Sequence, residues 1–417
     1  MKKRKERSSS AVQVTTRVPM EEWQVSYDDL NLVDRISDLS DELLRHILCF
    51  LPTNIAFTTS VLSKRWTKLC YLLPVLRFED INDHHRFCRI VNSVMLSRVT
   101  NQPLKIFSLN CRFMERKQNS SFNLKKWLEA TKRHCIEEFH LNLHFHHTLK
   151  PVVFISQTFV VLKLQRLDIE KDTSCVDLPS LKTLNLEYVS FENWNDYINF
   201  LYGCPILEDL QVEDISIRTL TKHYENNVPD VGFKSLTLAK LVRASIDSKD
   251  AHFNGIDNVE FLRIIKGYGS KEECFEFIPV FSNLVHIELV FWYHSIHSWD
   301  GVVELLRHSP RLQILFIKKW RKTRSSKEWK CPISNLECVS SHLRSCTILN
   351  FDNSANDLRF AKYILQNARI LQDMKIGFVI KSLNEILLEK GQIKEELSSF
   401  SRISRGCKLS FEFKFIY

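Results

Sequence analysis

Five histidines between positions 134 and 147 are the first candidates for chemistry in this sequence: His134, His140, His144, His146 and His147. If this stretch is a strand, His144 and His146 share a face, and two imidazoles on one face can bind a metal ion. No cysteine or carboxylate stands at a spacing that would complete the coordination set. The pattern favours a histidine-rich surface, and we expect neither a bound metal nor another cofactor.

Other catalytic signatures are missing from the sequence. The glycine pair at 267–270 lacks the following Gly-Lys-Ser/Thr of a phosphate-binding loop. The sequence contains no nucleophile elbow, no zinc-protease HExxH motif and no defined pair of acid–base carboxylates. We therefore predict that the chain is not an enzyme.

Composition indicates an ordered intracellular protein. The 417 residues are 44% hydrophobic with only 9 glycines and 11 prolines, and no apolar run approaches the ~20 residues of a membrane span. We expect neither a secreted nor a membrane-embedded protein. The 12 cysteines form no C-x-x-C pair and are scattered through apolar segments, which is typical of reduced, buried thiols.

Positive charge is concentrated in two places. Residues 1–30 are predicted to be a disordered tail that starts with five basic residues and one Glu among the first seven, and residues 318–330 hold seven basic residues and one Glu. The tail is either a nuclear localisation signal or only a solubilising segment, so we expect the nucleus, the cytoplasm or both. The second block predicts an exposed loop, and nucleic-acid binding there is a minority interpretation.

Three short helices are expected between residues 34 and 79. Ser40 is a natural N-cap, and Asp41 and Glu42 suit the positive end of the first helix. Pro52 ends that helix, while Thr53 and Ser63 are expected to cap the next two. The first helix carries two apolar stripes, which are Leu43, Ile47 and Leu51, and beside them Leu44 and Leu48. About 45 residues bury too little surface to stand alone, so one stripe must pack on the rest of the chain or on a partner.

This segment resembles the F-box of large plant protein families, most specifically in DELLRHILCFLPT and VLSKRW. The resemblance implies an F-box at 31–79 that binds a Skp-type adaptor and, through it, the cullin of an SCF ubiquitin ligase. It also implies that a set of residues divides between the F-box core and the adaptor surface: Leu39, Ser40, Leu43, Leu44, Ile47, Leu48, Leu51, Pro52, Val61, Leu62 and Trp66.

Three positions depart from the family pattern. Ser40 replaces a proline, Asn54 a lysine and Cys70 a tryptophan. Loss of one interface side chain typically weakens binding by about 1–2 kcal/mol, so these departures predict weaker adaptor docking. Two alternatives stay open here: a ligase-independent protein-interaction scaffold, and a helical subdomain that merely caps a larger fold.

A short pattern, apolar-x-x-apolar-x-apolar, recurs through the rest of the chain. It starts at positions 104, 136, 159, 181, 207, 233, 259, 284, 312, 343 and 371, and a start at 164 also fits. Four consecutive steps of 25 or 26 residues predict stacked units, each with one strand and a returning segment. We expect an α/β leucine-rich-repeat solenoid of the ribonuclease-inhibitor type over 80–328; a globular domain with coincidental spacing is the alternative.

The C-terminal part, 329–417, resembles the FBD domain that follows such repeats in many plant F-box proteins. The resemblance is carried by Trp329, Pro332, Cys338, His342, Tyr363, Asn367, Ala368, Met374, Cys407 and Phe411. The family supplies no defined chemistry for this domain. We therefore expect it to cap the solenoid, because an uncapped array would expose its last apolar residues.

The residues that alternate with the buried ones on each strand should form a concave binding face. Early strands present polar and acidic groups there, including Glu187 and Glu213, and the strand expected at 235–239 presents Ser235, Thr237 and Ala239. Later strands and a nearby loop present the target-binding candidates: Phe261, Arg263, Ile265, His286, Glu288, Trp292, Tyr293, Trp299, Ile314 and Phe316. The alternative is that the FBD region folds back over them. The sequence as a whole predicts the substrate-recognition subunit of an SCF ubiquitin ligase.

Overall fold

A computed structural model describes residues 35–79, 81, 83–98, 104–111, 123–221, 238–247, 255–266, 278–291, 299–319, 329–332, 335–351, 354–380 and 391–415. The strands it contains join in a single 14-stranded sheet, in which every pairing is parallel. Strand order follows the chain from β1 to β14, except that the two-residue β7 pairs with β5. Strands that are neighbours in sequence are therefore neighbours in space, and the sheet does not close on itself.

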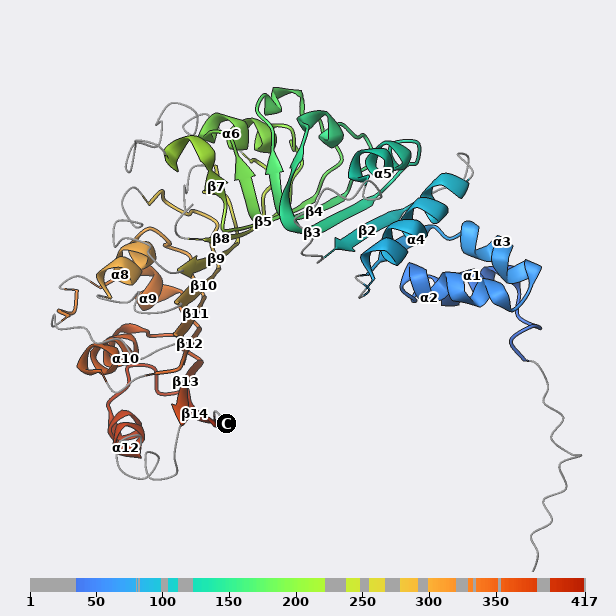
Figure 1. The fold of residues 1–417 in the computed structure, drawn as a ribbon. Helices are drawn as coiled ribbons and strands as arrows, with labels where there is room; N and C mark the ends of the chain where they lie inside the picture. Colours follow the sequence, from blue (N-terminus) through green and yellow to red (C-terminus); the bar gives the residue numbers. More distant parts are fainter. Residues whose placement is uncertain are drawn as a thin grey trace, which may run out of the picture.

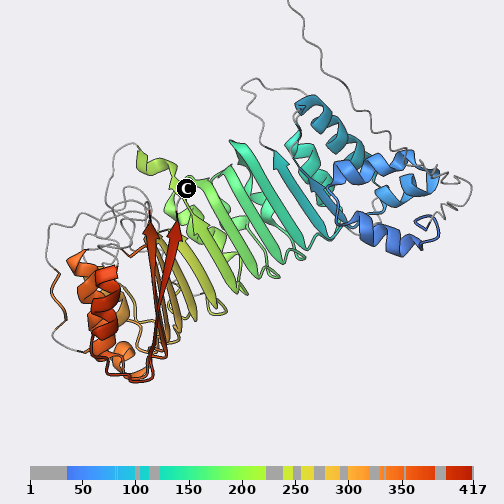
Figure 2. The same ribbon diagram turned by 90° about the horizontal axis from the view of Figure 1, so that it is seen from below.

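The sheet forms the inner side of an arch and the helices lie along its outer side (Figure 1). Seen from below, the strands lie side by side in one curved sheet (Figure 2). The strands are β1 Val75–Phe78, β2 Ile106–Cys111, β3 Glu138–Leu149, β4 Val161–Ile169, β5 Thr183–Phe191, β6 Asp209–Glu213, β7 Ser216–Ile217, β8 Arg243–Asp247, β9 Phe261–Lys266, β10 His286–Phe291, β11 Ile314–Lys319, β12 Ser345–Leu349, β13 Asp373–Ile380 and β14 Lys408–Phe415.

Helices and single turns connect these strands. The α-helices are α1 Asp41–Leu48, α2 Thr53–Thr58, α3 Lys64–Tyr71, α4 His84–Ser97, α5 Leu124–Thr131, α6 Trp194–Tyr202, α8 Asp300–Arg307, α9 Glu337–Ser341, α10 Ala355–Asn367 and α12 Gly391–Ser399. The 3₁₀ turns are η1 Thr59–Val61, η2 Pro151–Phe154, η3 Thr173–Cys175 and η4 Arg218–Thr221. Among the described residues, no helix is both long and apolar enough to cross a membrane.

The recurring apolar pattern builds the core. With one exception, each motif start is followed two residues later by a strand. Within each strand the apolar pair points away from the concave side, as Leu184 and Leu186 do on β5, and the first leucine of the motif, such as Leu181, lies buried beneath the turn. Stacking of these units gives one continuous core that runs the length of the sheet.

The exception is the motif at 233. Its first five residues lie outside the described part of the chain, but β6 and β9 both pair directly with β8, which begins at Arg243. The place between β6 and β9 is therefore taken by β8, and Arg243 and Ser245 stand on the concave face there. Of the residues expected at this place, Ser235 and Thr237 lie outside the described residues and Ala239 lies in a turn before β8. The true motif starts at Leu241 and is hard to recognise because Ala244 occupies an inward position that a larger side chain fills in the other units.

The ambiguous start at 164 has a structural cause. Strand β4 spans both candidate motifs, because Arg166 adopts a left-handed conformation (φ 57°) that turns the chain so that Leu167 and Ile169 also face the core. Tyr188 and Asp214 repeat this conformation at equivalent positions in the next two units. Such a conformation costs about 1–2 kcal/mol for a residue other than glycine. Two contacts of the Arg166 guanidinium offset part of this cost. It lies 5.3 Å from the centre of the Tyr188 ring, and it donates a hydrogen bond to Asn142 Oδ1 at 3.0 Å.

The FBD region does not form a separate cap. Its strands β12, β13 and β14 continue the same sheet in the same register, and α9 and α10 continue the outer layer. It does cover the last apolar residues of the repeats expected at 80–328, since Leu315 and Ile317 on β11 are fully buried, whereas Leu409, Phe411 and Phe413 on its own last strand β14 are only half-buried.

His140 on β3 predicts a pH dependence of stability. Burial, followed by Lys163 and Arg77, lowers the pKa of His140 to about 4. The unfolded chain, with an ordinary histidine pKa near 6.5, therefore binds an extra proton between these values, and stability falls as the pH drops from about 6.5 to about 4. The loss should be smaller in His140→Asn, as measured by urea unfolding at pH 7 and pH 5 for both chains. Equal losses in the two chains would contradict this assignment.

Candidate functional site

The helices α1, α2 and α3 form a small bundle with a core of its own. Ser40 caps α1, where its hydroxyl accepts the N–H of Leu43 at 3.4 Å. Arg65 on α3 holds the start of α1 in place by donating to Asp41 Oδ1 and to the Ser37 carbonyl, both at 2.7 Å. The fully buried residues of this bundle are Leu44, Leu48, Ala56, Leu69, Cys70 and Leu73, with Leu39, Leu51 and Trp66 partly buried against them.

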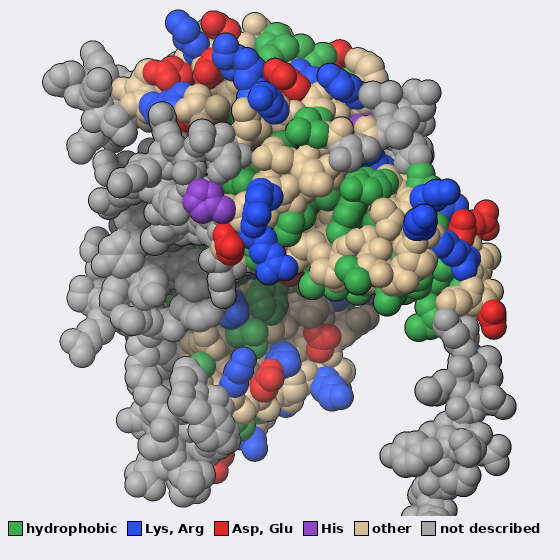
Figure 3. All heavy atoms as spheres, turned by 45° about the vertical axis from the view of Figure 1, so that its right-hand side comes forward, with side chains coloured by type: hydrophobic (Ala, Val, Ile, Leu, Met, Phe, Trp, Pro, Cys, Tyr) green, Lys and Arg blue, Asp and Glu red, His purple; other side chains and the backbone are tan. Residues whose placement is uncertain are grey.

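The opposite side of the bundle exposes large apolar side chains. Leu43 is 52% exposed, Ile47 47% and Phe50 75% on and after α1, while Val61 and Leu62, at and after η1, are 87% and 67% exposed. We call these five residues the apolar face of the bundle. Hydrophobic side chains gather on this end of the molecule (Figure 3). A soluble protein rarely leaves this much apolar surface grouped without a partner.

The two apolar stripes expected on α1 are present, except that Phe50 takes the place of Leu51 in the outer stripe. Leu44 and Leu48 point inward, whereas Leu43 and Ile47 point outward. Leu51 does not continue the outer stripe, because α1 ends at Leu48 and the turn that follows directs Leu51 to the core and Phe50 to solvent. Phe50 was missed for this reason, although its i+7 spacing from Leu43 was a usable signal.

The structure also corrects the roles expected for Thr53, Ser63 and Cys70. Thr53 does not cap α2, since its hydroxyl accepts the N–H of Arg77 on β1 at 2.7 Å, and Ser63 makes no side-chain cap on α3. Cys70 is fully buried, and its thiol donates to the Ala56 carbonyl at 3.1 Å. Cys70 therefore belongs to the bundle core and cannot itself weaken a surface contact.

Cys70→Trp is accordingly expected to harm the protein. An indole at this closed position overpacks the core, which typically costs about 1–3 kcal/mol, and also removes the bond to Ala56. The expected result is a lower thermal midpoint and no gain in adaptor binding. Ser40→Pro, at an exposed position, serves as the comparison at another departure. A Cys70→Trp chain as stable as the native protein would show that the core has room that the packing does not suggest.

Two arginines fasten the bundle to the sheet. Arg77 on β1 donates to the Cys49 carbonyl, at the C-terminal end of α1, at 2.8 Å. Arg98, directly after α4, donates to the Leu73 carbonyl at 2.7 Å, just beyond the end of α3. Burial lowers the pKa of Arg98 to about 10, which leaves it protonated at neutral pH. Positive groups at helix C-termini are stabilising, so these contacts fix how the bundle sits on the sheet.

The target-binding candidates on β9 to β11 lie together on the concave face. His286 stands opposite Phe261 on one side and Ile314 on the other, and Glu288 stands opposite Arg263 and Phe316. The rings of Phe261 and His286 meet edge-on at 4.9 Å, and Glu288 lies 3.8 Å from Arg263 and 3.7 Å from His286. Burial lowers the pKa of His286, against the raising effect of Glu288.

One neighbour of this group escaped the sequence analysis. The Arg243 guanidinium lies 4.4 Å from the centre of the Phe261 ring and 3.7 Å from Asp209. The apolar pattern does not mark it, because Ala244 makes the motif that starts at Leu241 hard to recognise. Ile265 follows on the same face of β9 and is partly exposed.

The aromatic loop does not join this surface as expected. Trp292 and Tyr293 lie outside the described residues, and Trp299 is 1% exposed. Its indole stacks on Phe360 of α10 with ring centres 3.9 Å apart, so the prediction that Trp299 is an exposed anchor is wrong. A tryptophan before a helix can pack in the core as readily as it can bind a partner. Here the position of α10 determines that Trp299 is buried.

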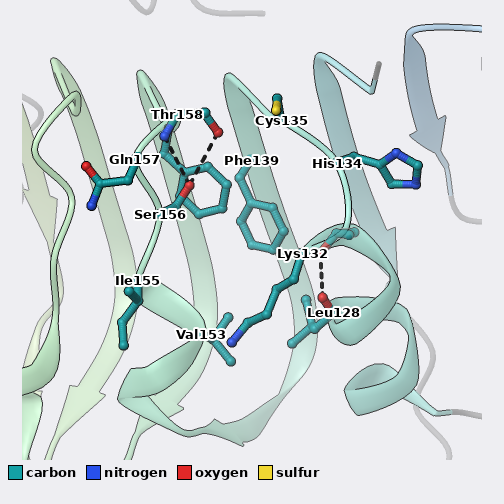
Figure 4. A pocket seen from close by; sticks show the side chains of 12 residues that line it. Leu128, Lys132, His134, Cys135, Phe139, Val153, Ile155, Ser156, Gln157 and Thr158 are labelled. Carbon is teal, nitrogen blue, oxygen red and sulfur yellow. Dashed lines mark hydrogen bonds between the residues drawn. The ribbon is translucent and has the colours of Figure 1, made fainter. Parts of the chain in front are cut away.

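A cavity of about 350 Å³ lies beside α5 at the start of β3 and β4 (Figure 4). Phe139 and Phe159 stack in it at 5.2 Å, and Lys132, His134 and Cys135 lie at its edge. Its polar groups are partly engaged, since Lys132 Nζ donates to the Val152 carbonyl at 2.9 Å and Thr158 Oγ1 to the Ile136 carbonyl at 2.6 Å. We assign no ligand to it.

The histidine cluster contributes no metal centre in the part of the chain that the structure describes, where no three metal-ligating side chains come together. The side chains of His144 and His146 lie outside that part.

Comparison with known proteins finds a matching family model at each end of the chain. The family model for the F-box domain matches residues 36–78, and the model for FBD matches residues 332–376. The F-box/FBD/LRR-repeat protein At4g00160 of Arabidopsis thaliana is 29% identical over 92% of this chain and 95% of its own length. The F-box/FBD/LRR-repeat protein At4g26340 (27%, 91% and 100%) and the FBD-associated F-box protein At3g52670 (29%, 91% and 98%), from the same plant, match similarly. The chain thus carries an F-box at one end and an FBD at the other, and it is similar over nearly all of its length to plant F-box/FBD/LRR-repeat proteins.

Proposed function

We propose that this chain is the substrate-recognition subunit of an SCF ubiquitin ligase. Its F-box binds a Skp-type adaptor, which connects it to the cullin, and its repeats bind the protein to be ubiquitinated. The observation that carries the proposal is the apolar face of the F-box bundle, whose leucine, isoleucine, valine and phenylalanine side chains are about half to almost fully exposed in the described chain. Burial of such a face against adaptor helices is the helix-in-groove mode of recognition.

We infer that the strands and outer helices form a leucine-rich-repeat solenoid. The parallel sheet in chain order, the core continuous from unit to unit and the motif spacing all support this assignment. In such an array the concave face is the usual binding surface. The surface on β9 to β11 is our candidate for target binding, because it combines an aromatic ring, half-exposed aliphatic side chains and charges of both signs.

The mechanism that follows is proximity. A receptor of this kind performs no bond chemistry; it raises the local concentration of a target lysine near the ubiquitin carrier held elsewhere on the ligase. The contacts of Arg77 and Arg98 suit this task, since they hold the F-box at a fixed orientation to the concave face. A fixed orientation keeps the target at a constant position relative to the adaptor.

Co-expression with a plant Skp-type adaptor and the N-terminal part of a cullin tests the proposal. We expect the three chains to elute from gel filtration as a single 1:1:1 complex. A folded chain that elutes without adaptor, while the adaptor still binds cullin, would contradict the ligase role and favour a ligase-independent scaffold.

A further inference from the structure

The two edge strands of the sheet, β1 and β14, differ in how they are covered. At β1 the F-box covers the edge: Leu76 and Phe78 are buried, and the outward N–H of Arg77 bonds to Thr53 Oγ1. At β14 no described strand covers the outer side, because β14 pairs with β13 alone. The core-facing residues of β14 are half-buried, whereas their counterparts on β13 are fully buried; the two sets are Leu409, Phe411 and Phe413, and Met374, Ile376 and Phe378.

Within the described ranges, no partner is found for a row of backbone groups on the outer edge of β14. The N–H of Lys408 donates to the Gln372 carbonyl at 2.8 Å, so the backbone groups of Lys408 and of every second residue after it point to β13. The N–H and C=O groups of Leu409, Phe411 and Phe413 therefore point outward. An edge strand of this length is a template for one more strand.

The sequence of β14 is complementary to itself. Apolar residues on the core side alternate with exposed charges on the other side, which are Lys408, Glu412 and Lys414. In an antiparallel pair of two copies, outward-pointing residues must face one another. Placing Lys408 opposite Glu412 of the second copy sets opposite charges together twice, while a shift by two residues toward the C-terminus sets Lys408 against Lys414 and a shift by four sets Glu412 against Glu412. Like charges directly opposite each other are destabilising.

We propose that β14 is a dimerisation edge, at which two copies of this chain pair antiparallel with Lys408 of each opposite Glu412 of the other. The hydrogen-bonded pairs are then Leu409 with Phe411 of the second copy and the reverse. The half-buried phenylalanines of both copies complete each other's core. Glu412 lies 2.6 Å from Lys375 of its own chain and is exposed, so its carboxylate is open to a second cation.

The pairing leaves the rest of the molecule free. The F-box and β14 lie at opposite ends of the arch (Figure 1), so a dimer formed at β14 carries its two F-boxes on its outer ends. One strand edge buries less surface than the ~1,600 Å² of a standard interface, so we expect dissociation in roughly the micromolar range. The inference is independent of adaptor binding and concerns the chain itself.

Analytical ultracentrifugation of the full chain tests the pairing with two charge reversals. The native chain should shift with concentration from its 49.2 kDa monomer mass toward twice that value. Lys408→Glu and Glu412→Lys should each remain monomeric up to at least ~10-fold higher concentration, because each places like charges opposite one another. An equimolar mixture of these two variants should dimerise again, since each reversal then meets its complement. Lys182→Glu, on an exposed residue before β5, serves as the control and should dimerise like the native chain.

Each other outcome overturns the proposal. A native chain that stays monomeric at ~100 μM has no dimerisation edge. Dimers that survive both reversals use a different surface. If both variants are monomeric, with native thermal midpoints, and their mixture stays monomeric, the antiparallel pairing is wrong.

Discussion

Lys319→Ala should lower the free energy of unfolding by about 3–5 kcal/mol, the largest loss we expect from a single change in this chain. The ammonium of Lys319 at the end of β11 pairs with the Asp357 carboxylate in the first turn of α10, and both side chains are almost completely buried. Removal of the lysine leaves the carboxylate buried without that cation, and burial of such a charge is costly. Urea unfolding followed by circular dichroism measures the loss.

Two further chains separate the charge effect from packing. Lys319→Met with Asp357→Leu removes both charges and should recover most of the stability, since replacement of a buried pair by apolar residues is often neutral. Lys182→Ala breaks an exposed pair with Glu208 at 2.8 Å and should cost less than about 1 kcal/mol. If Lys319→Ala were as mild as Lys182→Ala, the junction of β11 and α10 would not depend on this ion pair.

Leu43→Asp combined with Ile47→Asp should weaken adaptor binding at least ~100-fold, equivalent to about 2.7 kcal/mol, and leave the thermal midpoint unchanged. Both side chains are about half exposed in the free chain, so the carboxylates remain in water until an adaptor would bury them. Titration calorimetry against the adaptor measures the effect. Ile370→Asp, at an exposed position before β13, is the matched control and should bind normally.

The neighbouring pair should behave in the opposite way. Leu44→Asp with Leu48→Asp places two carboxylates in the core of the bundle, so the F-box helices should unfold before adaptor binding can be assessed. Native affinity in the Leu43 and Ile47 variant would show that the adaptor uses another surface.

The sequence predicted those features that depend on local periodicity. Apolar residues two apart, preceded by a third, sufficed to indicate where strands such as β5 and β10 begin, because the inward pair of a strand is a short-range signal. The split of α1 into an inner and an outer stripe followed from helical spacing in the same way.

Features set by distant parts of the chain could not be obtained this way. Whether Trp299 faces solvent depends on Phe360, 61 positions later, and whether Thr53 caps its own helix depends on the N–H of Arg77. β8 was misplaced because Ala244 is too small to mark a core position by itself. The open edge at β14 likewise depends on whether another described segment packs against it, and a local sequence pattern does not contain that information.

Hydrogen exchange of the chain with and without the Skp-type adaptor tests the central claim most directly. Protection should appear in peptides that cover α1 and η1, where Leu43, Ile47, Phe50, Val61 and Leu62 are exposed, and should leave β9 to β11 unchanged for a target to use. Protection on the concave strands, or none at the F-box, would contradict the assignment of these two surfaces.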